Sequence, residues 1–438
     1  MPFNGFLIAA PQSGNGKTIV TFGLLRALKR RGVAVMSAKS GPDYIDPTFH
    51  SLASGQNCTS LDAWAMRPAL IGHLVKDARD GLLIVEGAMG LFDAAADGTG
   101  SSADLASMLG LPVVLVVDCG GQSHSIAAVV AGFRDFRPDV SVTGVILNRV
   151  GSERHEAMLR EALAKIGMPV HGALRRSETM ALPSRHLGLV QAQEQADLDA
   201  LMDRLADEME ASLDIDGLLE LPNRQNPANS SAGARSLAPP TPPLGQRIAV
   251  ALDVAFGFFY SHIAKGWREA GAEISFFSPL ADEAPPGHCD AVFLPGGYPE
   301  LHAAQISSNR NFLNALRKAA DASIPIYGEC GGYMVLGKTL TDAEGVGHDM
   351  AGLLELETSF AKRRLHLGYR NVSLRDDGPL GEQNQDFAAH EFHYSTAIRE
   401  EGAPLLTARD ALGEELGPKG LRAGSVFGSY MHLIDRRP

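Results

Sequence analysis

Short, uninterrupted runs of apolar residues recur along the first half of the chain, separated by segments whose apolar residues follow a helical spacing. A strand that is apolar at every position is buried on both faces, as in a parallel sheet covered by helices. The pattern therefore predicts an α/β domain with a parallel sheet and helices on both of its faces. The predicted strands are Phe6–Ala10, Ala34–Ala38, Leu82–Glu86, Val113–Asp118 and Val142–Asn148, and the predicted helices include Thr18–Arg31 and Arg154–Ile166.

Residues 222–246 interrupt this pattern. They read PNRQNPANSSAGARSLAPPTPPLGQ, which is rich in Pro, Asn, Ser and Ala and predicts a linker. After it the alternation restarts in a second α/β domain, with a strand-rich tail from about Gly352 to Pro438. We therefore expect domains at residues 1–221 and 247–438. The predicted strands that open the second domain are Arg247–Leu252, Glu273–Phe277, Ala291–Leu294 and Ser323–Tyr327.

Charge and cysteine content narrow the class of partner. The chain has 438 residues and a formal net charge of −12 at pH 7. Proteins that bind nucleic acids normally carry a basic surface, so we expect small-molecule partners and no nucleic acid. The four cysteines are scattered and form no CxxC pair, which argues against a disulfide or zinc framework. Because no signal peptide and no membrane-spanning apolar run is present, we expect a cytoplasmic protein without a membrane partner.

A phosphate-binding loop follows the first predicted strand. Residues 10–18 read APQSGNGKT and lead into a predicted helix, which is the context of a P-loop, although Pro11 stands where the general pattern has its first glycine. The amides of such a loop surround phosphates, the lysine neutralises them and the Thr hydroxyl can ligate Mg²⁺. The candidate nucleotide-binding residues are Ser13, Gly14, Asn15, Gly16, Lys17 and Thr18.

Acidic residues follow two other predicted strands at their carboxyl ends, where open parallel sheets place ligands. Asp43, Tyr44 and Asp46 lie in the loop after the second strand, while Glu86 ends the third strand and Asp93 follows it. An acid at the tip of a strand beside a P-loop commonly positions Mg²⁺. Glu86 and Asp46 are therefore candidate metal ligands together with Thr18. Asp118, at the end of the fourth strand, fits either a supporting residue or a helix cap.

Cys330 lies between a predicted strand and a predicted helix, in the sequence GECGGYMVLG. Flanking glycines allow a strained turn and close approach of a substrate carbonyl, and a helix N-terminus favours a thiolate. The PGGYPE segment after an earlier strand has the composition of an oxyanion-binding loop. We expect the oxyanion donors to be the amides of Gly331 and of Gly297 or Tyr298.

His432, in GSYMHL, is the candidate base for this thiol. The HEFHYS segment offers His390, Glu391 and His393 as competitors. Its two histidines are three residues apart in a probable strand and so lie on opposite faces, which argues against a metal site formed by this pair.

Several long motifs together resemble one family. The motifs PGGYPE, GECGGYMVLG, HEFHYS and GSYMHL resemble class I glutamine amidotransferases. The first half is similar to dethiobiotin synthetase-like P-loop ligases, and APQSGNGKT, KSGPDYIDPTFH and VEGAMGLFD resemble cobyrinate and hydrogenobyrinate a,c-diamide synthases. The resemblance covers nearly the whole chain except the linker.

The resemblance implies a reaction that uses ATP, Mg²⁺, L-glutamine and a corrinoid. The P-loop domain would convert a substrate carboxylate to an acyl phosphate, and ammonia released from glutamine would displace the phosphate. The implied roles are nucleotide and metal binding for Gly14, Gly16, Lys17 and Thr18, metal and acceptor binding for Asp46 and Glu86, substrate placement for Asp43, Tyr44 and Asp93, and glutamine hydrolysis for Cys330 and His432. Glu391 is a weak candidate for a third member of that pair.

Several alternatives remain open. Ala389 and His366 depart from the pattern that the family often shows, which leaves room for a different tetrapyrrole. The same chemistry would fit hydrogenobyrinate, cobyrinate, a nickel sirohydrochlorin or other corrinoid carboxylates. A remote alternative is a P-loop ATPase switch that carries an inactive amidotransferase domain, and for assembly a homodimer is kept open.

Overall fold

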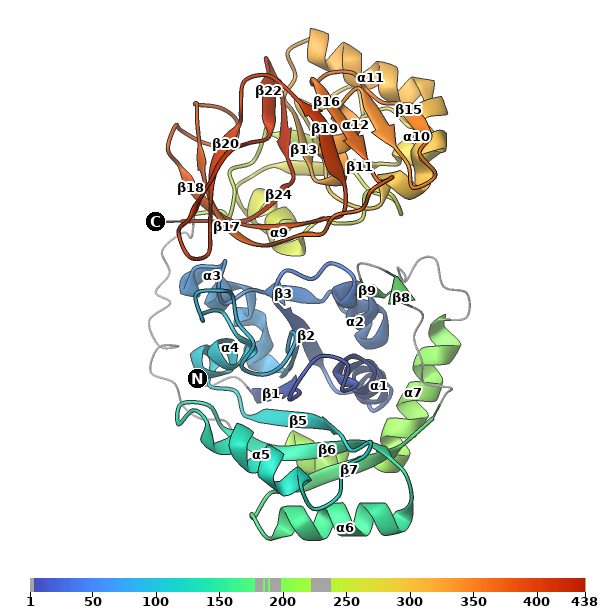
Figure 1. Cartoon of the computed structure of the whole chain (residues 1–438), viewed down its shortest axis with the longest axis vertical. Coiled ribbons are helices and arrows are strands. Elements are labelled where there is room, and N and C mark those ends of the chain that lie inside the picture. Colours follow the sequence, from blue (N-terminus) through green and yellow to red (C-terminus); the bar gives the residue numbers. More distant parts are fainter. Residues whose placement is uncertain (1–3, 178–183, 186–187, 190–197, 222–237, 438) are drawn as a thin grey trace. The chain divides into compact units, whose positions relative to one another are not determined.

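The computed structural model describes residues 4–177, 184–185, 188–189, 198–221 and 238–437. The expected linker therefore lies mostly outside the described residues. The chain divides into two compact units, Met1–Trp64 with Pro68–Ser236, and Ala65–Arg67 with Leu237–Pro438. Both are α/β units, so the predicted fold class is confirmed (Figure 1).

A seven-stranded sheet with the order β3-β2-β4-β1-β5-β6-β7 forms the centre of the first unit. Each neighbouring pair runs parallel, as the continuous apolar runs predict. The five predicted strands are present, and the two outermost strands, β3 and β7, add to them. The strands are β1 (Asn4–Ala9), β2 (Val35–Ser40), β3 (Thr59–Leu61), β4 (Leu82–Glu86), β5 (Val113–Asp118), β6 (Val142–Val150) and β7 (Val170–Arg175), with a separate short pair β8 (Ser184–Arg185) and β9 (Gly188–Leu189).

Helices cover both faces of this sheet. Figure 1 shows α1, α2 and α7 on one side of it and α3, α4 and α5 on the other. The strand order explains why the helices lie on two faces. The connection from β1 to β2 and that from β4 to β5 run in opposite directions along the sheet. Because crossovers between parallel strands are right-handed, their helices lie on opposite faces. The helices are α1 (Lys17–Arg30), α2 (Asp46–Ser54), α3 (Pro68–Leu74), α4 (Ser102–Leu109), α5 (Ile126–Asp135), α6 (Glu153–Ala164), α7 (Leu198–Ser212) and α8 (Ile215–Leu219).

The second unit contains a six-stranded sheet with the order β11-β10-β12-β13-β23-β22, in which β22 alone runs antiparallel to its neighbour. Its strands are β10 (Arg247–Ala251), β11 (Glu273–Phe277), β12 (Ala291–Leu294), β13 (Ile326–Glu329), β22 (Leu421–Ala423) and β23 (Val426–Ser429). Its helices are α9 (Ser261–Glu269), α10 (Ala303–Ser308), α11 (Arg310–Asp321) and α12 (Gly331–Leu336).

Strands that follow α12 form two further sheets, with the orders β15-β14-β16-β19 and β21-β20-β17-β18-β24, while β22 and β23 of the strand-rich tail join the six-stranded sheet. The strands of the first are β14 (Thr339–Thr341), β15 (Gly347–Asp349), β16 (Leu356–Ser359) and β19 (Thr396–Glu400). Those of the second are β17 (His366–Leu374), β18 (Asp386–His393), β20 (Leu406–Asp410), β21 (Glu415–Lys419) and β24 (Met431–Arg436).

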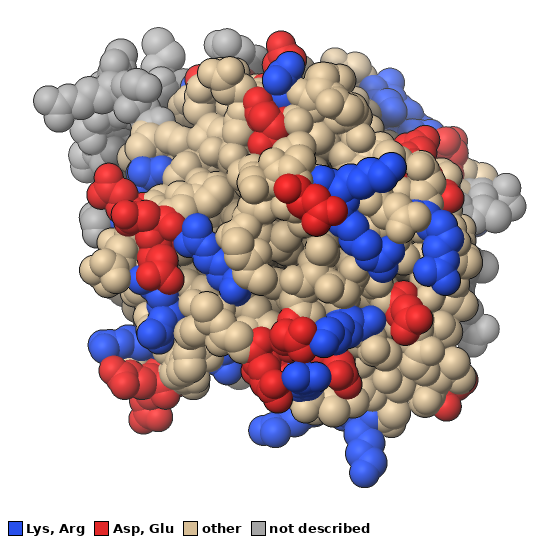
Figure 2. Space-filling model, turned by 90° about the horizontal axis from the view of Figure 1, so that it is seen from above, with Lys and Arg blue, Asp and Glu red and all other residues tan. Residues whose placement is uncertain are grey.

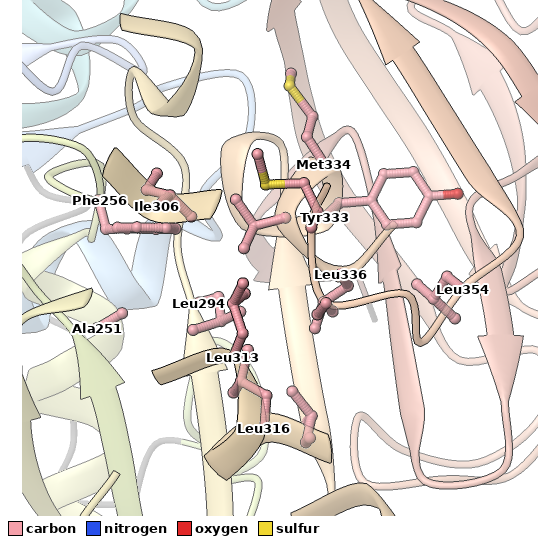
Figure 3. Packing of buried hydrophobic residues seen from close by; sticks show 14 of the residues in the cluster. Ala251, Phe256, Leu294, Ile306, Leu313, Leu316, Tyr333, Met334, Leu336 and Leu354 are labelled. Atoms are coloured by element: carbon pink, nitrogen blue, oxygen red, sulfur yellow. The ribbon is translucent and has the colours of Figure 1, made fainter. Parts of the chain in front are cut away.

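A buried apolar cluster joins the central strands of the second unit to α11 and α12. Figure 3 shows Leu294 of β12 beside Leu313 of α11, with Tyr333 and Leu336 of α12 close by. Cys330 belongs to the same cluster. Because close-packed interiors resist deformation, this cluster holds the turn around Cys330 in place.

Candidate functional site

The P-loop joins β1 to α1 in the first unit. Gly16 precedes the first residue of α1 with φ of 95°, which is a left-handed conformation that favours glycine. Asn148, from β6, donates from Nδ2 to the carbonyl of Asn15 at 2.8 Å, and a Cβ on Gly16 would lie 2.2 Å from the same nitrogen. A side chain at position 16 would therefore displace the residue that fixes the loop.

Lys17 and Thr18 both contact the neighbouring strand β4 or the loop after it. The Thr18 hydroxyl donates to Glu86 Oε1 at 2.7 Å, and the Lys17 ammonium donates to the carbonyl of Met89 at 2.5 Å. Burial lowers the pKa of Lys17, although nearby Glu86 opposes the shift. Lys17 thus donates to the loop of residues 87–93 in this structure. A bound phosphate would take the place of this loop as the partner of Lys17.

Glu86 is the centre of a buried polar cluster. Lys39, its partner in the parallel ladder between β2 and β4, donates from Nζ to Glu86 Oε1 at 2.8 Å and to Asp46 Oδ2 at 2.6 Å. The ring Nε2 of His50 lies 2.6 Å from Glu86 Oε2. Asp46 and His50 are four residues apart on α2, so they share one face of the helix. Each carboxylate oxygen of Glu86 therefore has a partner.

Opposite charges offset the cost of burying this cluster. Burial alone favours the protonated form of Glu86, but Lys39 and His50 outweigh it and hold the pKa of Glu86 far below its usual value. Burial likewise opposes the charge on Lys39, but Asp46 and Glu86 raise the pKa of Lys39. Burial, with the neighbouring charge of Asp43, raises the pKa of Asp46 to about 6. Lys39 therefore stays charged, and Asp46 takes up a proton at a higher pH than an exposed aspartate would.

The three candidate metal ligands come together here, because Thr18 and Asp46 are both linked to Glu86, the latter through Lys39. Hydroxyl and carboxylate oxygens are the donors that Mg²⁺ prefers, so the residues present fit this ion. A bound Mg²⁺ would neutralise the charge of nucleotide phosphates.

Two of the candidate substrate-binding acids fix the conformation of their loops by accepting hydrogen bonds from backbone amides. Asp43 Oδ1 accepts hydrogen bonds from the amides of Ile45 and Asp46 at 2.8 and 3.1 Å, and thereby shapes the start of α2. Asp93 Oδ2 accepts from the amide of Gly90 at 2.7 Å. Tyr44 lies beside Asp43 in the same loop and is partly exposed. Asp118 forms an ion pair with Arg149 at 2.5 Å.

Lys39, His50 and Asn148 are site residues that we did not anticipate. A signal for two of them exists in the sequence. Lys39 follows directly on the predicted strand 34–38, and His50 is one helical turn after Asp46. Asn148 ends a predicted strand two positions away from the P-loop strand in the sheet order, so only the tertiary structure brings it to Asn15.

In the second unit, Cys330 occupies a strained turn between β13 and α12. Its φ is 47° and its ψ is −104°, a conformation that non-glycine residues rarely adopt. The amide of Cys330 donates to the carbonyl of Ser429 in the adjacent β23 at 2.8 Å. A Cβ on Gly332 would lie only 1.9 Å from the carbonyl oxygen of Leu294, so glycine is required where α12 approaches β12.

His432 of β24 converges with Cys330 at Gly296. A Cβ on Gly296 would lie 2.5 Å from Cε1 of His432 and 3.3 Å from Cβ of Cys330. The two residues predicted as nucleophile and base therefore flank the same glycine. Its missing side chain leaves the space that a substrate carbonyl needs.

Two amides face this space, and one of the three predicted oxyanion residues needs correction. The Gly331 amide stabilises the Cys330 thiolate, and the nitrogen of Gly297 is 3.1 Å from the Cβ position of Gly331. The Tyr298 amide instead donates to the carbonyl of Ala255 at 3.1 Å. The Tyr298 amide is therefore occupied, and the pair suited to an oxyanion is Gly297 with Gly331.

Burial keeps both members of the Cys–His pair neutral in the resting state. Burial and the nearby Glu300 raise the pKa of Cys330, while burial, His390 and His393 lower the pKa of His432 to about 3. A neutral imidazole is the form that accepts a proton from a thiol.

Glu329, rather than Glu391, is the carboxylate near His432. Glu329 Oε2 lies 3.8 Å from His432 Nδ1, which is beyond hydrogen-bonding distance, and Oε1 accepts from the Tyr327 hydroxyl at 2.8 Å and from the Leu433 amide at 3.2 Å. Glu391 pairs instead with Arg370 at 2.8 Å. Glu329 also lines a small, largely aromatic pocket, and burial raises its pKa to about 8.

Two family models match the chain. The model of the CobQ/CobB/MinD/ParA nucleotide binding domain matches residues 6–190, and that of the CobB/CobQ-like glutamine amidotransferase domain matches residues 247–437. The hydrogenobyrinate a,c-diamide synthase of Brucella suis biovar 1 (strain 1330) is 59% identical over 437 residues, which cover 98% of each chain. The chain belongs to the family of this diamide synthase.

Two other relatives are also similar to this chain over nearly its whole length. The diamide synthase of Rhizobium meliloti (strain 1021) is 55% identical and covers 99% of each chain. That of Mesorhizobium japonicum (strain LMG 29417 / CECT 9101 / MAFF 303099) is 52% identical, over 100% of this chain and 99% of the relative. As a member of the diamide synthase family, the chain is a glutamine-dependent ligase that forms C–N bonds and contains a nucleotide-binding domain. Among the described residues, no helix is both long and apolar enough to cross a bilayer.

We expect Lys39→Met to lower the free energy of unfolding of the first unit by about 3–5 kcal/mol, because Glu86 and Asp46 then lose their shared cation. Glu86→Gln removes one of these charges, so the double variant should be more stable than additivity predicts. The chain has two tryptophans, Trp64 and Trp267. In a Trp267→Phe background, Trp64 fluorescence during denaturation reports on the first unit.

The control for this double-mutant cycle of Lys39 and Glu86 is Lys29→Met, at an exposed position of α1. Lys29→Met should change the free energy of unfolding by less than about 0.5 kcal/mol. Additive effects of Lys39→Met and Glu86→Gln would contradict the proposed ion pair.

We expect Glu329→Gln to alter how the stability of the second unit depends on pH. Burial raises the pKa of Glu329 from 4.5 to about 8, so between these values the folded state holds a proton that the unfolded state has released. The contribution of Glu329 to the free energy of unfolding is fully present below about pH 4.5. It is lost as the pH rises towards about 8, by at most about 1.4 kcal/mol per pH unit. The amide in Glu329→Gln does not titrate, so its stability should fall less.

Denaturation near pH 5 and near pH 8, followed by Trp267 fluorescence in a Trp64→Phe background, measures this difference. Glu344→Gln, at an exposed position, is the matched control and should follow the parent. Parallel pH dependence of the parent and Glu329→Gln would argue against the raised pKa.

Proposed function

We propose that the chain converts two carboxylates of a corrinoid, the a and c side chains of hydrogenobyrinate, to amides with ammonia from glutamine. The observation that carries this proposal is the match to relatives named hydrogenobyrinate a,c-diamide synthase over nearly their whole length. The convergence of Cys330 and His432 at Gly296 supports an active glutaminase and speaks against an ATPase switch with an inactive second domain.

The second unit would supply ammonia. His432 takes the proton of the Cys330 thiol, and the sulfur attacks the amide carbon of glutamine. Gly297 and Gly331 donate hydrogen bonds to the oxyanion that forms. His432 returns the proton to the nitrogen, so ammonia leaves as the C–N bond breaks, and water then hydrolyses the glutamyl thioester to glutamate and the free thiol. Burial raises the pKa of Cys330, so the thiol is protonated before His432 takes its proton.

The first unit would activate the acceptor, since a carboxylate becomes a good acyl donor only when its oxygen can leave as phosphate. Lys17 and the P-loop amides bind the phosphates of ATP, and a carboxylate oxygen of the corrinoid attacks the γ-phosphorus with release of ADP. Ammonia then attacks the acyl carbon, and phosphate leaves. Lys39, charged beside Glu86, is suited to bind the negative charge of the acceptor or the transferred phosphoryl group.

Metal binding and substrate placement are part of this proposal. Thr18, Asp46 and Glu86 would hold Mg²⁺, which supplies charge neutralisation between nucleotide and acceptor. Asp43, Tyr44 and Asp93 shape the loops that border the acceptor. Among these three, Asp43 and Asp93 would act through the backbone amides that they bind.

Partner, location and assembly complete the proposal. We propose a cytoplasmic enzyme without a nucleic-acid partner, and keep a homodimer as its candidate assembly. Figure 2 shows acidic and basic side chains interspersed on the face that it presents, and the net charge of the chain is −12. Neither feature suits a phosphate backbone.

Product analysis tests the substrate. The purified protein is incubated with ATP, Mg²⁺, glutamine and one of three acceptors, hydrogenobyrinate, cobyrinate or a nickel sirohydrochlorin, and the products are examined by mass spectrometry. We expect hydrogenobyrinate to gain two amides. Diamidation of cobyrinate alone, or of a nickel sirohydrochlorin alone, would replace the proposed substrate, and no amidation of any of them would refute the reaction.

We expect Cys330→Ala to abolish amide synthesis from glutamine but to retain synthesis from free ammonia, because the two reactions use different residues. Cys289→Ala, at a half-buried cysteine, should keep both activities. Glu86→Gln should lose synthesis with either nitrogen source while its glutaminase remains. Glutamine-driven synthesis by Cys330→Ala would contradict the assigned nucleophile.

A further inference from the structure

His366, Glu391 and His393 form a cluster on one face of the ladder between β17 and β18. His366 and His393 are direct partners in this antiparallel ladder, and Glu391 is two residues before His393 on the same strand. One potential ligand atom from each residue lies within 4.8 Å of the others. We propose that these three residues bind a divalent transition-metal ion of the zinc class.

This set differs from the pair that the HEFHYS motif suggests. His390 and His393 are three residues apart on β18 and cannot share a face, and His390 is instead the ladder partner of His432. The second histidine comes from β17, about 27 residues earlier in the chain, through strand pairing. Two histidines and one carboxylate are a common ligand set for zinc, with water in the fourth position.

The hydrogen bonds of His393 leave its other ring nitrogen suited to a metal. Nδ1 of His393 is 3.2 Å from the backbone carbonyl of Ser395 and 3.0 Å from its hydroxyl. A carbonyl can only accept, so in the tautomer in which Nδ1 donates to it, a neutral ring has its lone pair on Nε2. Metal-binding histidines typically make this second hydrogen bond to a backbone carbonyl.

Nε2 of His393 faces Glu391 Oε1 at 3.4 Å. Two lone pairs at this distance repel each other unless a proton or a metal ion lies between them, so this contact is a place where a metal can replace a proton. The separation matches that of ligands around tetrahedral zinc, because bonds of about 2.0–2.2 Å place two ligand atoms about 3.3–3.5 Å apart. Two of the three ligands therefore have the required spacing without movement.

The third ligand has room to move into place. His366 is partly exposed, whereas Glu391 and His393 are buried. Its ring stacks on that of His393 with centroids 4.6 Å apart, and its ligand nitrogen lies within 4.8 Å of those of the other two residues, so a rotation of this partly exposed side chain would have to complete the set.

Glu391 is held so that one oxygen remains for a metal. Arg370 donates from Nε and Nη2 to Oε2 at 2.8 Å, which leaves Oε1 towards His393. Gly368 is the ladder partner of Glu391 and has no side chain, and a Cβ there would lie 2.5 Å from Nη1 of Arg370. Glycine at this position therefore keeps the approach of Arg370 to the carboxylate open.

The binding experiment uses the full-length Cys330→Ala protein, so that the nearby thiol cannot act as a ligand, with excess Mg²⁺ to occupy oxygen-ligand sites. Titration calorimetry and equilibrium dialysis with Zn²⁺ measure affinity and stoichiometry. We expect one zinc per chain, and at least about tenfold weaker binding when His366→Ala is added. His348→Ala, which removes a histidine paired with Asp342 at 2.7 Å, should bind like the parent.

Cobalt provides a second readout, because its absorption spectrum reports the geometry of the ligands. Co²⁺ in a tetrahedral site absorbs visible light strongly, so the parent should show these bands and the His366→Ala protein should not. Zinc binding that is unchanged by His366→Ala, or absent from the parent at micromolar concentrations, would overturn the proposal.

A metal here would also affect the glutaminase, a consequence that rests on the proposed function. The thiol of Cys330 contacts the carbonyl of Phe392 at 3.9 Å, and Phe392 lies between Glu391 and His393. With Cys330 intact, zinc should inhibit glutamine hydrolysis and spare synthesis from ammonia, and His366→Ala should need about tenfold more zinc. Equal sensitivity of both proteins would place the inhibitory zinc on Cys330 and refute this consequence, even where dialysis shows binding.

Discussion

The buried carboxylate of Glu86 is the interaction on which the first unit depends. Its two oxygens contact Thr18 of the P-loop, Lys39 of β2 and His50 of α2, so one side chain connects the phosphate-binding loop to the loop expected to border the acceptor. A carboxylate without exposed surface is tolerated only with such partners. The requirement for charge balance thus places nucleotide and acceptor residues together, and phosphoryl transfer needs that proximity.

The second unit depends on close backbone approach instead of charge. Gly296, Gly328, Gly332 and Gly428 surround Cys330, and a Cβ on any of them would meet a neighbour within 2.7 Å. These contacts bring β12, β13, β23 and α12 together tightly enough to hold Cys330 at a positive φ. The strain is sustained by a packed core, because Cys330 itself lies in the apolar cluster of this unit.

The sequence predicted most of the sheet in the first unit, because buried parallel strands are continuous apolar runs that can be recognised without tertiary information. It did not reveal β3 and β7, the outer strands of that sheet. It also gave Lys17, Thr18, Asp46, Glu86, Cys330 and His432 as candidate site residues, and the structure places them in two clusters. It missed Lys39 and Asn148, which gain their roles only from strands that pair or lie near one another in the sheet.

Periodicity and long motifs are properties of contiguous residues, so the fold class, the family and the residue types at each site could be predicted before the fold was known. Which atoms are available depends on the folded chain. It showed that the Tyr298 amide is taken by Ala255, that Glu329 rather than Glu391 lies near His432, and that His366 joins His393 across a ladder. Hydrogen bonds and strand pairing between distant residues decide these points, and no local pattern encodes them.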